Sequence, residues 1–157
     1  MIKVRSATPF LFVIAAAVLV MPTVLNLIKG PAKTPGVFDD QYTLYQATAL
    51  SQETGKPMLV LATADWCPPC QKLKRTTLMD PVVVDWINEH TIPVYLEDGA
   101  SPDEIASLGV RSYPTTMLIQ DGQILASLGG PVGSGQFIKV LGAELPASGE
   151  MVSETQP

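Results

Sequence analysis

The sequence predicts a single α/β domain of roughly 105 residues behind an apolar N-terminal segment. Segments with helical periodicity alternate with short apolar runs of strand length. The first of these runs, residues 57–62, is apolar at every position, which is typical of a strand buried on both faces of a sheet. The composition, 46% hydrophobic and 16% charged, agrees with a globular domain plus one apolar segment.

The charge distribution argues against one broad class of function. The chain has 15 acidic and 10 basic residues, a net charge of −5, and a pI of about 4.7. It contains no basic run that could contact a phosphate backbone. Nucleic acid is therefore not expected as a partner.

Residues 10–28 form an apolar segment without a charged side chain, after a short flank at residues 1–9. As a helix rising ~1.5 Å per residue, the segment would cross most of a bilayer's ~30 Å hydrocarbon layer. A cleaved signal peptide would have a shorter apolar region and a small-x-small cleavage site, and no such site follows Ile28. We therefore predict a transmembrane anchor, with a cleaved signal as the alternative.

The charges that flank the apolar segment predict its orientation. Lys3, Arg5 and the amino terminus precede it, whereas Lys29 and Lys33 follow it. The positive-inside rule thus slightly favours a cytoplasmic N-terminus. A single span in the inner membrane would then hold the domain on the periplasmic or an equivalent extracytoplasmic side, whereas cleavage would release it into the periplasm.

Residues 29–40 predict a short linker, because glycine and proline recur there without apolar periodicity. The domain itself is assigned to residues 41–145. It opens with a predicted helix at 41–54, and Gly55 follows where a helix C-terminus favours glycine. The buried strand at 57–62 comes next.

Breaks and turn signals define the elements that follow. Asp80-Pro81 separates two helices, Asp121-Gly122 predicts a hairpin turn, and Ser134 is a candidate N-cap for the last helix. The predicted elements are helices at 71–78 and 82–90, a strand at 92–96, a helix at 101–109, strands at 115–120 and 124–128, and a helix at 134–141. Residues 146–157 are polar, and we predict a disordered tail.

The two cysteines of the chain, Cys67 and Cys70, are separated by two prolines. A structural zinc site needs four ligands, and His90 is the single histidine. A c-type haem needs histidine directly after the second cysteine, where this chain has Gln71. A structural disulfide closing so short a loop would contribute only about 2 kcal/mol. The pair is therefore interpreted as redox-active, with no metal and no cofactor.

Thiol–disulfide exchange assigns different roles to the two cysteines. A helix N-terminus lowers the pKa of a thiol there, so Cys67 is predicted to be the nucleophile. Cys70, one turn further, is predicted to resolve the mixed disulfide. Pro68 and Pro69 stiffen the turn and remove two N–H donors to the Cys67 sulfur, which favours a reducing potential.

Four local patterns carry a resemblance to a known family. They are A-D-W-C-P-P-C at 64–70, G-V-R-S-Y-P-T at 109–115, Asp121-Gly122, and Gly129-Gly130 before the last helix. With the order of elements, the domain resembles the thioredoxin fold, a central mixed sheet flanked by helices. Residues 56–80 look most like the C-terminal domain of DsbD-type thiol–disulfide interchange reductases, and membrane-tethered TlpA-like reductases are the alternative.

The resemblance implies roles for residues around the cysteines. Pro114 would follow a cis peptide bond and lie against the cysteines, where the backbone of Tyr113 would pair with an extended substrate. Trp66 would cover the edge of the site. Asp65 would either steer proton transfer or simply be solvated, and the two readings remain open.

One position departs from the family pattern. Thioredoxins usually have a buried acid six residues before the first cysteine, and this chain has Leu61 there. Glu97, Asp98 or water would have to substitute as proton acceptor, or the second step would be slower. The basic residues after Cys70, namely Lys72, Lys74 and Arg75, are predicted to form a solvated helix face.

We therefore expect a membrane-anchored thiol–disulfide oxidoreductase that reduces disulfides of extracytoplasmic proteins. Its expected partners are a disulfide-containing protein, a membrane or soluble electron donor, and membrane lipid around the N-terminal helix. The alternatives are a disulfide-forming oxidase and a redox-silent adaptor in membrane or cytochrome assembly.

Overall fold

The computed structural model describes residues 14, 18, 20, 21, 30–40 and 42–145. Two compact units make up the chain, Met1–Ala32 and Lys33–Pro157. Among the described residues, no helix is both long enough and apolar enough to cross a membrane. The anchor predicted at 10–28 and the tail predicted at 146–157 lie mostly or entirely outside the described residues.

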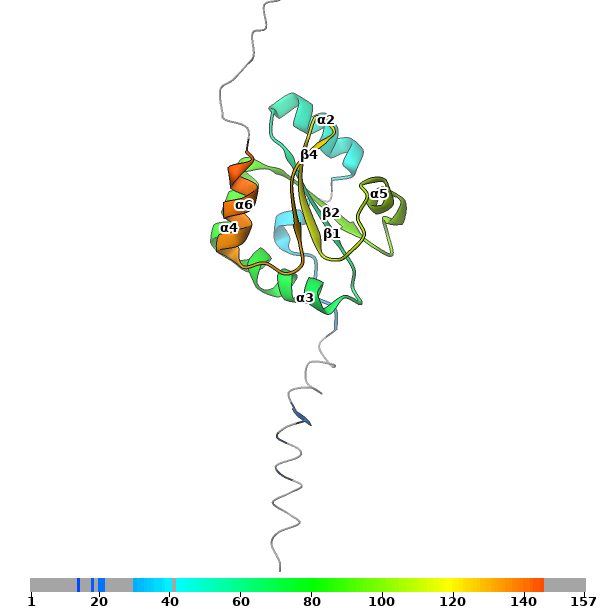
Figure 1. Cartoon of the computed structure of the whole chain (residues 1–157), viewed down its shortest axis with the longest axis vertical. Helices are drawn as coiled ribbons and strands as arrows, with labels where there is room; N and C mark the ends of the chain where they lie inside the picture. The colour runs from blue at the N-terminus through cyan, green and yellow to red at the C-terminus, as the bar shows by residue number, and fades with distance from the viewer. Residues whose placement is uncertain (1–13, 15–17, 19, 22–29, 41, 146–157) are drawn as a thin grey trace, which may run out of the picture. The chain divides into compact units, whose positions relative to one another are not determined.

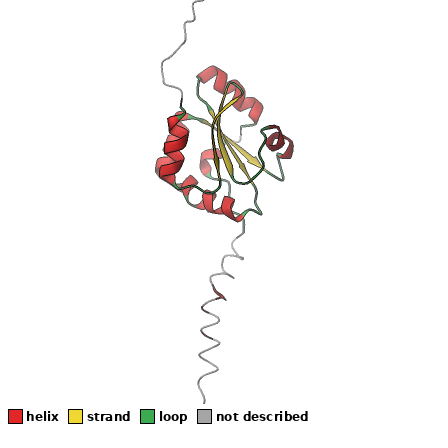
Figure 2. Ribbon diagram, viewed as in Figure 1, coloured by secondary structure: helices red, strands yellow, loops and turns green. Residues whose placement is uncertain are grey.

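A four-stranded mixed sheet forms the centre of the second unit (Figures 1 and 2). The strand order is β2-β1-β3-β4. Strand β1 pairs with β2 in parallel and with β3 antiparallel, and β3 pairs with β4 antiparallel. The strands are β1 (Met58–Thr63), β2 (Ile92–Glu97), β3 (Thr115–Gln120) and β4 (Gln123–Gly129).

Helices cover both faces of this sheet (Figure 2). The α-helices are α2 (Leu44–Thr54), α3 (Pro68–Arg75), α4 (Pro81–His90), α5 (Pro102–Ser107) and α6 (Ser134–Ala143). Two 3-10 turns, η1 (Gly36–Phe38) and η2 (Thr77–Met79), complete the unit. The structure thus confirms the predicted α/β fold with a mixed sheet.

Strand β1 is buried along its whole length because both of its faces are covered. Leu59 and Leu61 belong to one core cluster, which α3, α4 and α6 also enter. Val60 and Ala62 belong to a second cluster on the other face, shared with α2 and α5. Since successive side chains of a strand point to opposite faces, this arrangement explains why the run shows no polar alternation.

Capping residues set the ends of the helices. Thr43 accepts a hydrogen bond from the backbone of Gln46, and the Gln46 side chain accepts one from the Thr43 backbone, so α2 begins at Leu44 rather than at residue 41. Gly55, with φ of 71°, ends the same helix. Asp80 accepts from Val82 N at 3.0 Å and starts α4.

The predictions for the start of α3 and for the N-cap of α6 differ from the structure. The helix predicted at 71–78 begins earlier, because Pro68 and Pro69 occupy its first positions, and it ends at Arg75 before the separate turn η2. Ser134, predicted as an N-cap, is instead the first residue of α6; Gly133 is the N-cap and offers no side chain to bond the helix.

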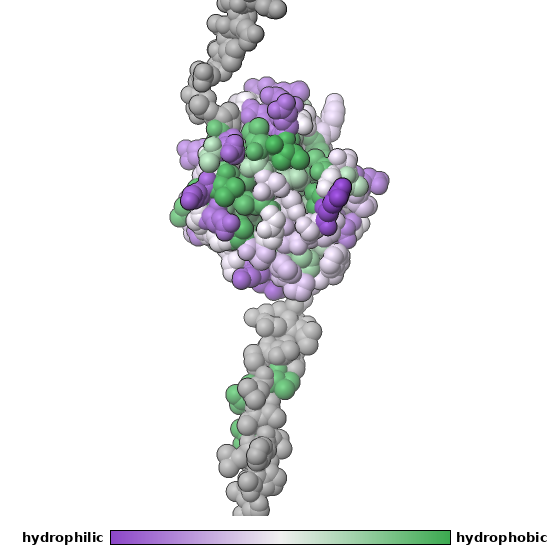
Figure 3. Space-filling model, viewed as in Figure 1, coloured by the Kyte–Doolittle hydropathy of each residue, from purple (hydrophilic) through white to green (hydrophobic). Residues whose placement is uncertain are grey.

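The β3–β4 hairpin closes at Asp121-Gly122, as predicted. Both residues have positive φ, 51° and 75°, which is the conformation that the tightest hairpin turns require. The space-filling view shows apolar and polar residues intermixed on the face of the domain turned to the viewer (Figure 3).

Candidate active site

The two cysteines lie where the chain passes from strand β1 into helix α3. They form a disulfide, with their Cα atoms 5.3 Å apart. Cys67 is the N-cap of α3, and its Sγ accepts a hydrogen bond from Cys70 N at 3.2 Å. Pro68 and Pro69 are the first two residues of the helix. The sulfur of Cys67 therefore sits at the end of α3 where backbone N–H groups and the helix dipole favour a negative charge.

Both cysteines are well shielded from solvent. Cys67 is 3% exposed and Cys70 is 0% exposed, so what little access there is belongs to Cys67. They form a small buried cluster with Ala64, and Tyr113 packs against it. The Tyr113–Pro114 peptide bond is cis.

Aromatic side chains and Asp98 form a rim beside the disulfide. Trp66 is 70% exposed and meets the Tyr113 ring edge-on, with the ring centroids 5.9 Å apart. The indole Nε1 of Trp66 donates to one carboxylate oxygen of Asp98 at 3.2 Å. The hydroxyl of Tyr113 donates to the other oxygen at 2.7 Å. Asp98 thus fixes both rings relative to each other.

The electrostatic surroundings keep Tyr113 neutral. Its hydrogen bond to Asp98, partial burial and the negative charges of Asp98 and Glu97 raise the pKa of Tyr113 to about 12. At neutral pH its hydroxyl therefore acts as a donor. Glu97 in turn ties the loops after β1 and β2 together, because its two oxygens accept from Asp65 N at 3.2 Å and from Gly99 N at 2.7 Å.

Leu61 is 1% exposed and belongs to the core. On the neighbouring strand its register partner is Tyr95. Glu97 and Asp98 are the two carboxylates that could substitute for an acid at this position. Glu97 accepts hydrogen bonds from the backbone of Asp65 and Gly99, and Asp98 accepts hydrogen bonds from Trp66 and Tyr113.

Lys74 corrects one prediction. It was expected to share a solvated face with Lys72 and Arg75, yet its side chain is 1% exposed. Its Nζ donates to Asp65 Oδ1 at 3.0 Å and contacts the Tyr95 hydroxyl at 3.1 Å. Lys74 follows Cys70 by four residues, so helical spacing places it on the same face. That spacing is the sequence signal that could have found it.

Burial and hydrogen bonding act in opposite directions on Lys74. Burial lowers the pKa of its ammonium, but the hydrogen bonds with Tyr95 and Asp65, and the charge of Asp65, more than offset this effect. The pKa therefore lies above its ordinary value of 10.5. Lys74 is a buried cation at neutral pH, and its carboxylate partner Asp65 is 54% exposed at the side chain.

A family model of the thioredoxin-like domain matches residues 44–144. The chain belongs to this family. A thioredoxin of Pseudomonas aeruginosa is 30% identical over 89 residues, which is 57% of this chain and 80% of that protein. The Thiol:disulfide interchange protein DsbD 1 of the same organism is 38% identical over 64 residues, which is 39% of this chain but only 11% of that protein.

Solved structures show the same thioredoxin-like fold. The DsbH oxidoreductase superposes with a TM-score of 0.61 at 20% identity, covering 67% of this chain and 83% of that one. A thioredoxin from Thermus thermophilus gives 0.56 at 22% identity, covering 63% and 81%. Family membership and the Cys67–Cys70 disulfide together support thiol–disulfide oxidoreductase activity.

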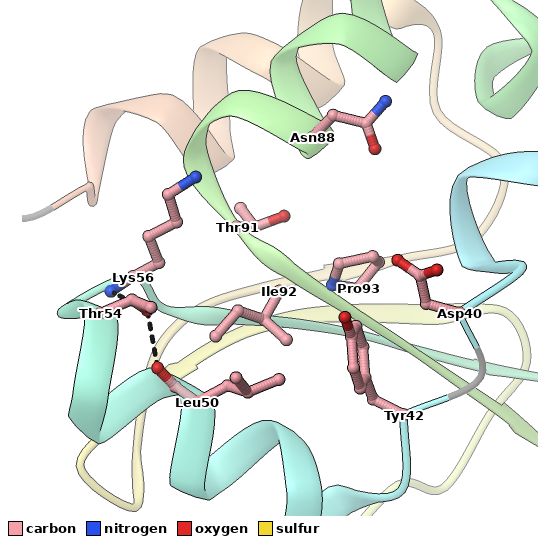
Figure 4. Close-up of a pocket in the computed structure, with 9 residues that line it drawn as sticks. All are labelled: Asp40, Tyr42, Leu50, Thr54, Lys56, Asn88, Thr91, Ile92 and Pro93. Atoms are coloured by element: carbon pink, nitrogen blue, oxygen red, sulfur yellow. Dashed lines mark hydrogen bonds between the residues drawn. The ribbon is translucent and has the colours of Figure 1, made fainter.

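A separate pocket of about 260 Å³ lies beside the start of strand β2 (Figure 4). Ile92 lines it at the start of β2 and pairs with Met58 at the start of β1, whereas the cysteines follow the end of β1. Its lining residues are Asp40, Tyr42, Leu50, Thr54, Lys56, Asn88, Thr91, Ile92 and Pro93. Within the described part of the chain, no three acidic, histidine or cysteine side chains converge on a site that could hold a metal.

Proposed function

We propose that the protein reduces disulfides of other proteins in an extracytoplasmic compartment, and that residues 10–28 hold it at the inner membrane. The observation that carries the direction of the reaction is the set of donors around Cys67. Its Sγ accepts from Cys70 N, and the two intervening prolines have no N–H to add. A thiolate with few donors is less stabilised, and a less stable reduced state corresponds to a more reducing couple.

The reaction proceeds in two exchange steps. The Cys67 thiolate attacks one sulfur of a substrate disulfide, so that a Cys67–substrate disulfide forms and the other substrate sulfur leaves as a thiolate. Cys70 then attacks Cys67 Sγ, which closes the intramolecular disulfide and releases the second substrate thiolate. Two electrons pass to the substrate, and a dithiol donor must return them to the cysteine pair.

The surroundings of the cysteines suit this order of events. Cys67 retains 3% exposure and Cys70 none, so an incoming disulfide reaches Cys67 first. Trp66 and Tyr113 form an aromatic rim beside it, which offers apolar surface to a peptide. The similarity of 64 residues of this chain to the Thiol:disulfide interchange protein DsbD 1 supports a role in thiol–disulfide exchange with other proteins.

Activity, reduction potential and cysteine variants test the proposal. The purified chain should reduce insulin disulfides with a dithiol donor, and its reduction potential should lie between about −270 and −180 mV. A potential well above about −180 mV would instead favour disulfide formation. The Cys70→Ser variant should accumulate a mixed disulfide at Cys67; if the cysteine-to-serine variants keep full function in the cell, the redox role is wrong.

The membrane part of the proposal has its own test. After expression of the full chain with a C-terminal tag, the tagged protein should fractionate with membranes, resist carbonate extraction and be accessible to protease added from the periplasmic side. Release into the periplasmic fraction with a shortened N-terminus would show that the segment is a cleaved signal.

A further inference from the structure

We infer that Lys74 is a positioning residue for Cys70: its buried ammonium stabilises the Cys70 thiolate and so favours the ionisation of Cys70, although it does not itself accept the proton. This inference rests on the proposed function, because it concerns the second exchange step. It assigns a role to a buried cation in a site that has Leu61 at the position where thioredoxins usually have a buried acid.

The path of the Lys74 side chain brings the ammonium toward the cysteines. Residues four apart on a helix have Cβ atoms ~5–6 Å apart on one face, and helix side chains tilt toward the N-terminus. Lys74 therefore extends back from its own turn toward the turn of Cys70. Its ion pair with Asp65, which precedes the helix, shows that Nζ reaches the N-terminal loop of α3.

The surroundings of this path are buried, so the charge is only partly screened. Cys70 is 0% exposed, and the side chain of Lys74 is 1% exposed. Tyr95 holds the ammonium from the sheet side at 3.1 Å, with its ring centroid 5.7 Å from Nζ. A charge fixed in this way acts on a neighbouring thiolate much more strongly than one in water.

A second buried polar group lies on the same face of the sheet. Thr63 follows Leu61 by two positions on β1, so both side chains point to the face that α3 covers. Its Oγ1 is buried and has no hydrogen-bond partner within the described residues. The hydroxyl is thus available as a donor in a region that otherwise holds a cation.

The remaining ionisable groups near the disulfide oppose the lysine. Asp65 lies in the loop that leads to Cys67, and Glu97, at the end of β2, accepts a hydrogen bond from Asp65 N. Asp98 accepts a hydrogen bond from the Tyr113 hydroxyl at the rim. Their negative charges raise the pKa of a nearby thiol, as does burial. Lys74 is the buried cation on the helix that carries Cys70, and it favours the ionised sulfur.

The balance of the second step shows what Lys74 does and does not do. The Cys70 thiol loses its proton to solvent, because Lys74 is already protonated and cannot accept it. The thiolate then attacks Cys67 Sγ, the Cys67–Cys70 bond forms, the bond to the substrate sulfur breaks, and that sulfur leaves as a thiolate that solvent protonates. Lys74 lowers the cost of the anion and takes no part in the bonds.

The test measures ionisation of Cys70 directly, without turnover. In the full-length Cys67→Ser variant, Cys70 is the remaining thiol, and the ultraviolet absorbance of its thiolate can be titrated against pH. We expect a midpoint below the unperturbed value of ~8.5, although burial alone would raise it. Adding Lys74→Met should raise the midpoint by about one pH unit or more, a tenfold loss of thiolate at neutral pH.

Lys72→Met is the matched control, since it removes the same charge from an exposed position of the same helix, and it should leave the midpoint nearly unchanged. Lys74→Gln, which removes the charge but can still donate to Asp65 and Tyr95, replaces Lys74→Met if that variant does not fold. An unchanged or lower midpoint, or equal changes for Lys72 and Lys74, would overturn the inference, as would a Cys67→Ser midpoint at or above ~8.5.

A parallel turnover assay distinguishes failure of the proposed oxidoreductase function from failure of the role of Lys74. If the chain with both cysteines reduces no protein disulfide, the proposed function fails whatever the titration shows. If it is active and Lys74→Met alters neither the midpoint nor the pH profile of exchange, only the role of Lys74 fails. The expected result is an active protein whose pH profile moves to higher pH in Lys74→Met and stays in place in Lys72→Met.

Discussion

The hydrogen bond between Tyr113 and Asp98 should make the stability of the domain depend on alkaline pH. The folded protein holds the pKa of Tyr113 at about 12, against an ordinary value of 10.0. A group whose pKa is higher in the folded state contributes stability that is complete below pH ~10 and is lost as the pH rises toward the folded value. The predicted window is therefore about pH 10 to 12, and Tyr113→Phe should remove this contribution.

The size of the effect follows from that difference. A rise of the pKa from 10.0 to about 12 corresponds to at most about 2.7 kcal/mol, at about 1.36 kcal/mol per pKa unit. Because Tyr113 is only partly buried, solvent screens the interaction, and we expect about 1–2 kcal/mol. Below pH ~9, Tyr113→Phe should be less stable than the wild type by a similar amount, since it lacks a hydrogen bond to a charged group.

The assay is urea unfolding of both proteins at several pH values between about 8 and 11.5, with the phenolate absorbance of the folded proteins as an independent titration. The difference in unfolding free energy should shrink steadily above pH ~10. A difference in unfolding free energy that stays constant across this range would show that Asp98 does not hold Tyr113 neutral. The same conclusion would follow if the phenolate absorbance of the wild type minus that of Tyr113→Phe, which isolates Tyr113 from the other tyrosines, titrated near 10.

Three further changes test the core, a cap and the rim. Phe137→Ala should lower the unfolding free energy by about 3–5 kcal/mol, because the ring is fully buried and packs edge-on against Trp86; a loss below about 1 kcal/mol in denaturant unfolding would contradict that packing. Asp80→Ala should cost about 1 kcal/mol through loss of the bond to Val82 N, whereas Asp80→Asn should retain most of it. Trp66→Ala should change the unfolding free energy by less than about 1 kcal/mol, because the side chain is exposed. It should slow thiol–disulfide exchange with protein disulfides more than exchange with a small aromatic disulfide. Equal slowing of exchange with the two kinds of substrate would rule out a contact between Trp66 and the substrate peptide.

Local chemistry made much of the fold predictable. The apolar run at β1 and the turn at Asp121-Gly122 each have one physical solution, a strand covered on both faces and a tight hairpin. Helix starts are harder to predict, because several neighbouring residues can cap a helix. The capping box of Thr43 and Gln46 is visible in the sequence, yet the predicted helix began at residue 41.

The site shows where sequence reasoning stopped. The spacing of Cys67 and Cys70 is enough to predict the redox pair. The partners of Lys74 are not predictable in this way, because Asp65 lies in a loop and Tyr95 lies on a strand 21 residues away in the sequence. Three basic residues close together after Cys70 looked like one solvated face, although helical geometry turns one of them inward. Only the packing of α3 on the sheet decides that a lysine can be buried there, because it places Asp65 and Tyr95 within reach.

The two edges of the sheet differ in what they offer to a neighbouring chain. Strand β2 forms one edge and contains Pro93, which has no N–H to give to an added strand. Strand β4 forms the other edge, and between Gln123 and Gly129 it contains neither proline nor a charged side chain. An extended peptide that adds a strand to this sheet would therefore be disfavoured at β2 by Pro93, whereas β4 contains no residue that disfavours strand addition.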